Sequence, residues 1–169
     1  MGVLPIRTER LTIRPFRLAD VPAIHAALYS DAAAMRFIGG PHAYERTHQG
    51  IAGYIEHQRT VGYSFWAVEE NATKQVIGEA GLYPMNGTGP DIELGYAFGT
   101  AWWGKGYATE TGRAILDAAF EHLDAPRVVA VAKAENTASV HVLEKLGFRS
   151  EGEREAWGSR QRFFVRDRD

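Results

Sequence analysis

The sequence contains no cysteine, and this absence removes several kinds of chemistry at once. Disulfides, zinc sites with thiolate ligands and enzymes with a cysteine nucleophile are all excluded. Histidine pairs spaced as in H-E-x-x-H and the G-x-S-x-G turn of serine hydrolases are missing as well. The chain therefore has to work without a thiolate metal centre or a covalent cysteine intermediate.

Blocks of like charge and long apolar runs are also absent. The net charge is −2, whereas a general nucleic-acid binder carries a basic face. No apolar run reaches the length of a membrane span, and arginines interrupt residues 1–16, which argues against a signal peptide. We therefore expect a cytoplasmic protein without a direct nucleic-acid or membrane partner.

The hydrophobic pattern indicates one domain over residues 1–169, because this length suits a single core and no repeat or long linker divides it. Alternating and helical periodicities predict the order β-α-α-β-β-β-α-β-α-β-β, a mixed α/β (α+β) fold. Strands are predicted at 10–17, 63–69, 76–84, 92–98, 127–132, 148–153 and 160–167, and helices at 20–29, 45–59, 107–123 and 136–146.

The stretch A-W-W-G-K-G-Y-A-T-E, residues 101–110, places two glycines where a predicted strand ends and a helix begins. Glycine allows a ligand to approach the backbone closely. Amides at a helix N-terminus, together with the helix dipole, attract an anion. The stretch therefore predicts a phosphate or pyrophosphate site.

Two nucleotide-binding motifs match this stretch only in part. The run from Gly99 to Lys105 fits G-x-x-x-x-G-K, but Gly106 stands where a P-loop needs Ser or Thr for magnesium. Gly104 and Gly106 supply two of the three glycines of a dinucleotide-binding turn, and the strands before them form a meander. A tight turn whose glycines serve packing alone is the remaining alternative.

A second motif lies about thirty residues downstream of this turn. W-W-G-K-G-Y-A-T-E followed by N-T-A-S-V-H-V-L-E-K-L-G-F resembles the GNAT superfamily of N-acetyltransferases, in particular the RimJ/RimL-like branch, which acetylates ribosomal-protein N-termini. R-T-E-R-L-T-I-R-P-F-R-L-A-D-V-P-A-I extends the likeness to about residues 8–166. The resemblance implies a GNAT-like fold, with a mostly antiparallel twisted sheet of about seven strands and four helices. It also implies acetyl-CoA as cosubstrate, and no metal.

The resemblance also implies which residues contact the coenzyme. The family's pyrophosphate loop falls on Trp103, Gly104, Lys105, Gly106, Tyr107 and Ala108. The end of the preceding strand, at Tyr96, Ala97 and Phe98, would bind the pantetheine arm through its backbone, and Asn136 would contact the coenzyme. Trp103 departs from the family's usual Gln or Arg, but this branch often carries an aromatic residue there, and the backbone amides are unaffected.

Two side chains are candidates for the chemistry. Glu93 resembles the family's glutamate on this strand and could accept the amine proton, directly or through water; an ion pair or a solvated strand residue is its alternative. Ser139 lies one helical turn after Asn136, where this branch often places a proposed proton donor to the thiol. It could instead only hydrogen-bond the sulfur, or be an ordinary first-turn serine. Without cysteine, direct attack in a ternary complex is favoured over a ping-pong route.

The acceptor side carries fewer markers. The loop 30–43, Trp66 and Tyr83 could wall it, although core packing is the commoner role for such aromatics. Three carboxylates could attract a cationic amine, and their spacing singles none of them out: Asp31, Glu45 and Glu79. The resemblance favours a protein or peptide N-terminus as acceptor. A small amine (amino acid, polyamine or aminoglycoside), or a non-catalytic CoA-binding module, is the alternative, and both monomer and homodimer stay open.

Overall fold

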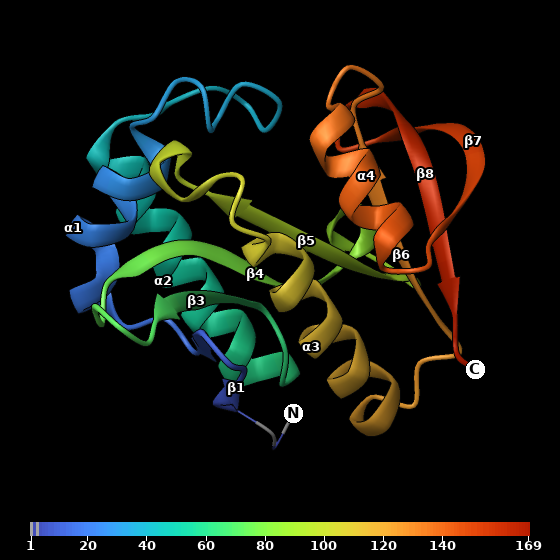
Figure 1. Ribbon diagram of the computed structural model, residues 1–169, viewed down its shortest axis with the longest axis horizontal. Helices are drawn as coiled ribbons and strands as arrows, with labels where there is room; N and C mark the ends of the chain where they lie inside the picture. The colour runs from blue at the N-terminus through green and yellow to red at the C-terminus, as the bar shows by residue number, and fades with distance from the viewer. Residues whose placement is uncertain (1, 3) are drawn as a thin grey trace.

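A computed structural model describes residues 2 and 4–169 as one eight-stranded sheet with helices packed on it (Figure 1). The strands lie in the order β1-β2-β3-β4-β5-β6-β8-β7, and all neighbours are antiparallel except β5 and β6. The strands are β1 (Ile6–Arg7), β2 (Leu11–Arg14), β3 (Phe65–Glu70), β4 (Val76–Pro84), β5 (Ile92–Phe98), β6 (Arg127–Ala132), β7 (Arg149–Ala156) and β8 (Ser159–Asp167). The helices are α1 (Val21–Ile24), α2 (Tyr44–Val61), α3 (Tyr107–His122) and α4 (Thr137–Lys145), with short helical turns η1 (Leu18–Asp20), η2 (His25–Tyr29), η3 (Met85–Gly87) and η4 (Thr100–Trp102).

The mixed α/β fold is confirmed, and β4, β5 and β6 have the predicted bounds. The sheet has one strand more than the seven expected, because the short β1 pairs with β2 through Ile6 and Ile13. Asp20 stands at the N-cap position of α1, as predicted, but its side chain makes no capping bond to that helix. Its carboxylate accepts the Arg17 amide at 2.8 Å and pairs with Arg14, so it closes the turn before α1.

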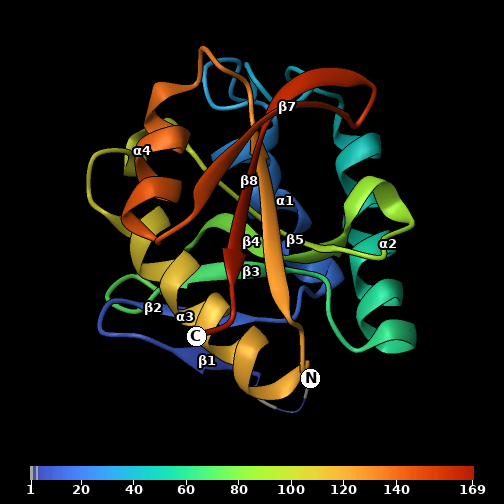
Figure 2. The same ribbon diagram turned by 90° about the vertical axis from the view of Figure 1, so that its right-hand side faces the viewer.

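The helices pack on both faces of the sheet, and each face has its own apolar cluster. Ile115 and Leu116 of α3 and Leu143 of α4 pack with one face of the sheet, and Ile24 of α1 and Ile51 of α2 pack with the other. Figure 2 shows α2 on one side of the strands and α3 with α4 on the opposite side. The predicted packing role of Trp66 is confirmed, since its ring is fully buried.

The parallel pair β5 and β6 separates soon after it begins. Register between them is confined to Glu93 opposite Val129, whereas β5 pairs with β4 along its whole length. Figure 1 shows the two strands diverging toward the carboxyl end of β5. Within the described residues, the edge of β5 at 96–98 therefore has no strand partner on the β6 side.

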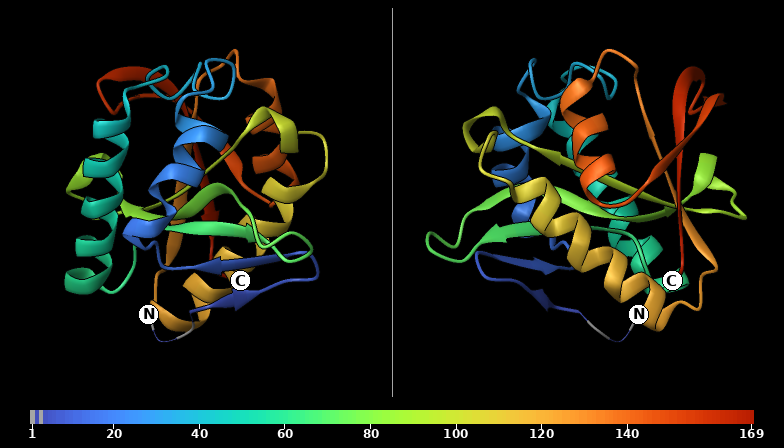
Figure 3. Two further views of the ribbon diagram at one scale, coloured as in Figure 1. Left: turned by 90° about the vertical axis from the view of Figure 1, so that its left-hand side faces the viewer. Right: turned by 45° about the vertical axis from the view of Figure 1, so that its right-hand side comes forward.

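The loop 30–43 and the turn after β5 lie along one edge of the molecule (Figure 3). Asp31 joins them, because one of its carboxylate oxygens accepts both the backbone amide and the hydroxyl of Thr100, at 3.2 and 2.6 Å. The Asp31 carboxylate also caps the turn at Ala33 and Ala34. These bonds hold the pKa of Asp31 below its usual range, with the Thr100 hydroxyl as the largest cause.

Candidate active site

The turn that opens α3 has the conformation that its glycines permit. Gly104 and Gly106 have φ angles of +74° and +78°, and α3 begins at Tyr107. A Cβ at Gly104 would meet nothing within 4 Å, so glycine is needed there for the dihedral angle or for a ligand, not for packing. The turn is exposed at the amino end of a sixteen-residue helix, which is the geometry of an anion site.

Trp103 fixes this turn to the end of β5. Its indole Nε1 donates to the Phe98 carbonyl at 2.8 Å, and its side chain is about half exposed. The aromatic residue at this loop position therefore has a structural role. The Phe98 carbonyl already has one partner, although a carbonyl oxygen can accept two hydrogen bonds.

The hairpin of β1 and β2 supports the turn that precedes α3. Arg10 donates to the Lys105 carbonyl at 2.8 Å and forms an ion pair with Glu110 at 2.6 Å. The second oxygen of Glu110 accepts the Thr8 hydroxyl at 2.6 Å and the Arg10 amide at 3.0 Å. Tyr107 donates to Glu70 of β3 at 2.6 Å. Although burial opposes it, this set of bonds keeps the pKa of Glu110 below its usual range.

The structure brings Tyr96, Ser139 and Asn136 together. Asn136 caps α4, since its side-chain oxygen accepts the Ser139 amide at 3.3 Å, as predicted. The Tyr96 hydroxyl lies 3.0 Å from Ser139 Oγ and donates to the Ser139 carbonyl at 3.2 Å. Burial raises the pKa of Tyr96 to about 12, and the bond to Ser139 lowers it in part.

Glu93 is in contact with the side chain of Trp157, which lies in the hairpin of β7 and β8. The Trp157 indole donates to Glu93 Oε2 at 2.7 Å. Trp157 and Gly158 form the two-residue turn between β7 and β8, with φ angles of +53° and +79°, and Asn86 accepts the Trp157 amide at 2.8 Å. Burial raises the pKa of Glu93 to about 7, while the Trp157 bond lowers it.

The side chains of β5 divide the site between the two faces of the sheet. Successive strand residues point to opposite faces, so Glu93 and Ala97 share one face, and Tyr96 and Phe98 share the other. Ala97 packs with the α1 and α2 cluster, whereas Tyr96 and Phe98 pack with the α3 and α4 cluster. Glu93 therefore faces the side of α1, α2 and the loop 30–43, and Tyr96 with Ser139 faces the side of the glycine turn.

The residues predicted to line the acceptor side lie in different environments. Tyr83, opposite Glu93 in the sheet, stacks on His57 at 4.3 Å between ring centroids and lies 6.4 Å from the Trp157 ring. Glu79 is buried and accepts the Tyr29 hydroxyl. The third of the three carboxylates, Glu45, is exposed at the start of α2.

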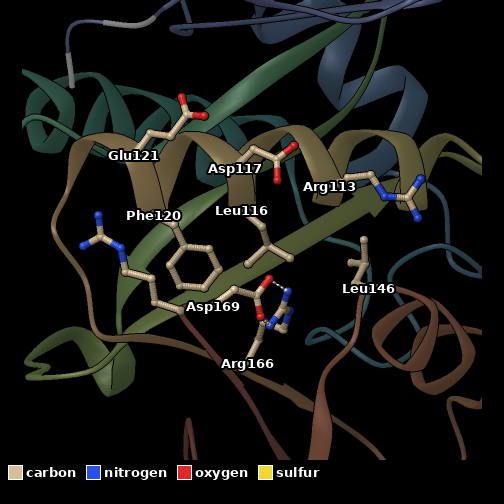
Figure 4. Close-up of a pocket in the computed structure, with 9 residues that line it drawn as sticks. Arg113, Leu116, Asp117, Phe120, Glu121, Leu146, Arg166 and Asp169 are labelled. Carbon is tan, nitrogen blue, oxygen red and sulfur yellow. Dashed lines mark hydrogen bonds and ion pairs between the residues drawn. The ribbon is translucent and has the colours of Figure 1, made fainter.

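Two cavities lie along α3, and neither is lined by Glu93, Tyr96 or Ser139. One, of about 400 Å³, is lined by Leu116 and Phe120 facing the Arg166–Asp169 ion pair (Figure 4). The other, of about 550 Å³, is more open and extends from Gly106 past Arg113. In the part of the chain that the structure describes, no helix could cross a membrane and no cluster of His, Asp or Glu could hold a metal.

Several contacts at the site involve residues that the sequence did not mark: Arg10, Tyr29, Glu110 and Trp157. The W-G pair at 157–158 is a recognisable turn signal, but nothing in it indicates contact with Glu93, 64 residues away. Arg10 and Glu110 are 100 residues apart, so their pairing is invisible to any local pattern.

Comparison with known proteins identifies the class. A family model described as "Acetyltransferase (GNAT) domain" matches residues 10–149, so the chain belongs to the GNAT acetyltransferase family. It is 29% identical over 147 residues to an uncharacterized N-acetyltransferase, p20, of Bacillus licheniformis, covering 86% of this chain and 82% of p20. The resemblance to the GNAT family seen in the sequence is thereby confirmed.

Solved structures agree with this assignment. The GNAT-family acetyltransferase from Bacillus anthracis is 27% identical, covers 95% of each chain and gives a TM-score of 0.79. RimL, a ribosomal L7/L12 alpha-N-protein acetyltransferase solved with coenzyme A, is 19% identical with a TM-score of 0.82 over 98% of each chain, a likeness of fold. The chain is therefore an acetyl-CoA-dependent acetyltransferase of RimJ/RimL-like fold.

Proposed function

We propose that this enzyme transfers the acetyl group of acetyl-CoA directly to a primary amine, and that the acceptor is a protein or peptide N-terminus. The observation that carries the proposal is the division of β5. Glu93 lies on one face of the strand, and Tyr96 with Ser139 lies on the other. A thioester carbon at the unpaired edge of β5 would have a proton acceptor on one side and hydroxyl donors on the other.

The coenzyme would be bound by the turn and the strand edge together. The amides of residues 103–108 at the start of α3 would hold the pyrophosphate, and the backbone of residues 96–98 would pair with the pantetheine arm. Asn136 would contact the coenzyme from the start of α4.

The reaction needs a neutral amine and a stabilised leaving group. As the nitrogen bonds to the thioester carbon and the carbon–sulfur bond breaks, Glu93 takes the proton lost by the amine, directly or through water. A carboxylate whose pKa is about 7 suits this task at neutral pH. Because Tyr96 donates its hydrogen to the Ser139 carbonyl, the Ser139 hydroxyl keeps its own hydrogen, which could turn from Tyr96 to the departing sulfur.

The fold shared with RimL supports a protein N-terminus as the acceptor. Trp157, which is about half exposed, and the partly buried Tyr83 offer aromatic surface next to the proposed base, as a short peptide would need. A small-molecule amine is the alternative acceptor.

The proposal is tested by measuring thiol release from acetyl-CoA over a panel of short peptides with free N-termini, together with amino acids, polyamines and aminoglycosides. We expect turnover with one or more of the peptides and none with their N-terminally blocked forms. Turnover confined to small amines would reject the peptide acceptor. Binding of acetyl-CoA without turnover of any acceptor would instead indicate a non-catalytic coenzyme-binding module.

The assignment of Glu93 is tested by Glu93→Gln, which keeps the shape and removes the base. We expect kcat to fall by about 100-fold or more, with the Kd of acetyl-CoA unchanged within about twofold. In the unmodified enzyme the rate should rise with pH to a plateau above about 7, as Glu93 loses its proton. An unchanged kcat at every pH would remove Glu93 as the base.

A further inference from the structure

A buried carboxyl, Glu79, lies on the same sheet face as the partly buried Glu93 and has no part in the mechanism proposed above. Glu79 of β4 is only 6% exposed, and the Tyr29 hydroxyl of η2 donates to its Oε2. Tyr29 is itself 7% exposed. Burying a carboxyl is costly, and an apolar side chain would fill this space without that cost, so the position calls for a reason.

Tyr29 stands where the loop 30–43 begins, and it also holds the end of that loop. Its backbone carbonyl accepts the His42 amide at 3.1 Å. The rings of Tyr29 and His42 meet edge to face, with centroids 4.7 Å apart. One residue therefore closes the loop, and its hydroxyl ties the closed loop to the sheet through Glu79.

The point of attachment adjoins the proposed acetyl site. Glu79 lies directly opposite Ala97 in the register of β4 and β5. Ala97 belongs to the segment of β5 proposed to bind the pantetheine arm, and it packs in the same apolar cluster as Tyr29. The loop is thus fixed to the strand that would present the thioester. Asp31 adds a second attachment, to Thr100 at the base of the coenzyme turn.

We propose that Glu79 is a positioning residue for the acceptor: through Tyr29 it holds the loop 30–43 at the segment of β5 that presents the acetyl group. This inference rests on the proposed function, because it takes the loop as one wall of the acceptor site. The Tyr29–Glu79 bond sets where that wall stands, and so sets how tightly the acceptor binds. The coenzyme side of β5 does not depend on it.

The first test measures the loop itself. Hydrogen exchange of backbone amides in residues 30–43 is compared among the unmodified protein, Tyr29→Phe and Glu79→Gln. Tyr29→Phe keeps the ring and removes the donor, and the loop amides, His42 above all, should exchange about tenfold faster. Glu79→Gln still offers an oxygen to Tyr29 and should stay within about threefold of the unmodified protein.

Tyr107→Phe is the matched control, because it also removes a tyrosine–glutamate bond, to Glu70, and among the described residues neither of these two side chains is hydrogen-bonded to the loop. Exchange at residues 30–43 should not change in it. Unchanged exchange in Tyr29→Phe, or equal acceleration in Tyr107→Phe, would overturn the proposal.

The second test is kinetic, with the best acceptor found in the panel. Tyr29→Phe should raise the KM for the acceptor about five- to tenfold and leave the Kd of acetyl-CoA within about twofold. A purely structural role would move both constants, and this result would reject positioning. If the unmodified protein acetylates no amine, the proposed function fails, whereas the exchange experiment still decides whether Tyr29 and Glu79 hold the loop.

Discussion

At the scale of single residues, two carboxyls on one sheet face show how burial tunes acidity. Glu79 and Glu93 each accept a hydrogen bond from an aromatic residue, Tyr29 in one case and Trp157 in the other. Burial raises the pKa of both to about 7, and each hydrogen bond opposes that rise. The sequence marked Glu93 through its strand and its resemblance, whereas Glu79 stood out only as one of three carboxylates without a distinctive spacing.

The Trp157 bond to Glu93 can be tested by its effect on the pH dependence of the rate. Because the indole hydrogen bond favours the carboxylate, Trp157→Phe should raise the pKa of Glu93 and move the rising limb of the rate to higher pH, by about half a pH unit to one unit. The shift is measured from steady-state rates between about pH 5.5 and 9, in a series of buffers with the same ionic strength.

Tyr83→Phe serves as the control for that experiment, since it keeps the ring 6.4 Å from Trp157 and leaves the indole in place. The rising limb of the pH–rate profile of Tyr83→Phe should coincide with that of the unmodified enzyme. If the rising limb of Trp157→Phe stays at the same pH, the titration of a group other than Glu93 controls the rate.

At the scale of elements, the hairpin of β1 and β2 supports the turn that begins α3. Arg10 neutralises Glu110 and holds the Lys105 carbonyl, so the acidic side chain in the first turn of α3 is paired. The sequence correctly predicted the turn, the start of α3 and the cap at Asn136, because those are local features. It could not predict the support, which comes from residues about one hundred positions away.

Removal of this support should weaken coenzyme binding. Arg10→Ala frees the Lys105 carbonyl and leaves the Glu110 carboxylate unpaired beside an anion site, so we expect the Kd of CoA measured by calorimetry to rise about tenfold. Arg7→Ala is the charge-matched control on the same hairpin, with an exposed side chain, and should change the Kd by less than twofold. Equal Kd values for the two variants would mean that Arg10 does not support the turn.

A pair of glycines tests the packing of β4 against β3. A Cβ at Gly81 would lie 2.1 Å from the Ser64 carbonyl oxygen, so Gly81→Ala forces the backbone to shift and should lower the free energy of unfolding by about 2 to 3 kcal/mol or more. Gly53 lies inside α2, and a Cβ there meets nothing within 4 Å. Gly53→Ala should therefore stabilise the protein by about 0.5 to 1 kcal/mol in the same urea titration.

At the scale of the whole molecule, the sheet lies between two helical layers, Asp31 and Thr100 join them at one edge, and β5 is where their chemistry would meet. The loop 30–43 follows η2 on the α1 and α2 side, and the glycine turn and Ser139 belong to the α3 and α4 side. The Trp157 hairpin reaches back across the sheet to Glu93, with its turn held by Asn86. On the proposed assignment, acceptor recognition and pyrophosphate binding would lie on opposite sides of the sheet.

Burial of Glu79 should also be visible in the stability of the whole protein. Its folded pKa of about 7 lies above the usual 4.5, so between these pH values the folded state keeps a proton that the unfolded state has lost. The folded state then binds more protons, and its stability falls as the pH rises through this window. The loss from this group is at most about 3 kcal/mol, and it is complete above pH 7.

The difference in unfolding free energy between Glu79→Gln and the unmodified protein isolates this contribution, because other groups titrate equally in both. That difference should grow in favour of the glutamine variant from pH 4.5 to pH 7 and stay level above it. Urea titrations at four or five pH values measure it. A difference that does not depend on pH would mean that Glu79 has an ordinary pKa.

The sequence by itself determined the features that depend on neighbours along the chain. The strands β4, β5 and β6, the glycine turn, the start of α3 and the Asn136 cap follow from periodicity, turn residues and capping, which act over a few positions. Together with the family resemblance, they were enough to identify an acetyl-CoA-dependent acetyltransferase. Tertiary structure alone decided that Trp157 lies on Glu93, that Arg10 supports the turn and that Tyr29 reaches Glu79. Those contacts join residues 50 to 95 positions apart, and only the packing of strands and helices brings such residues within hydrogen-bonding distance.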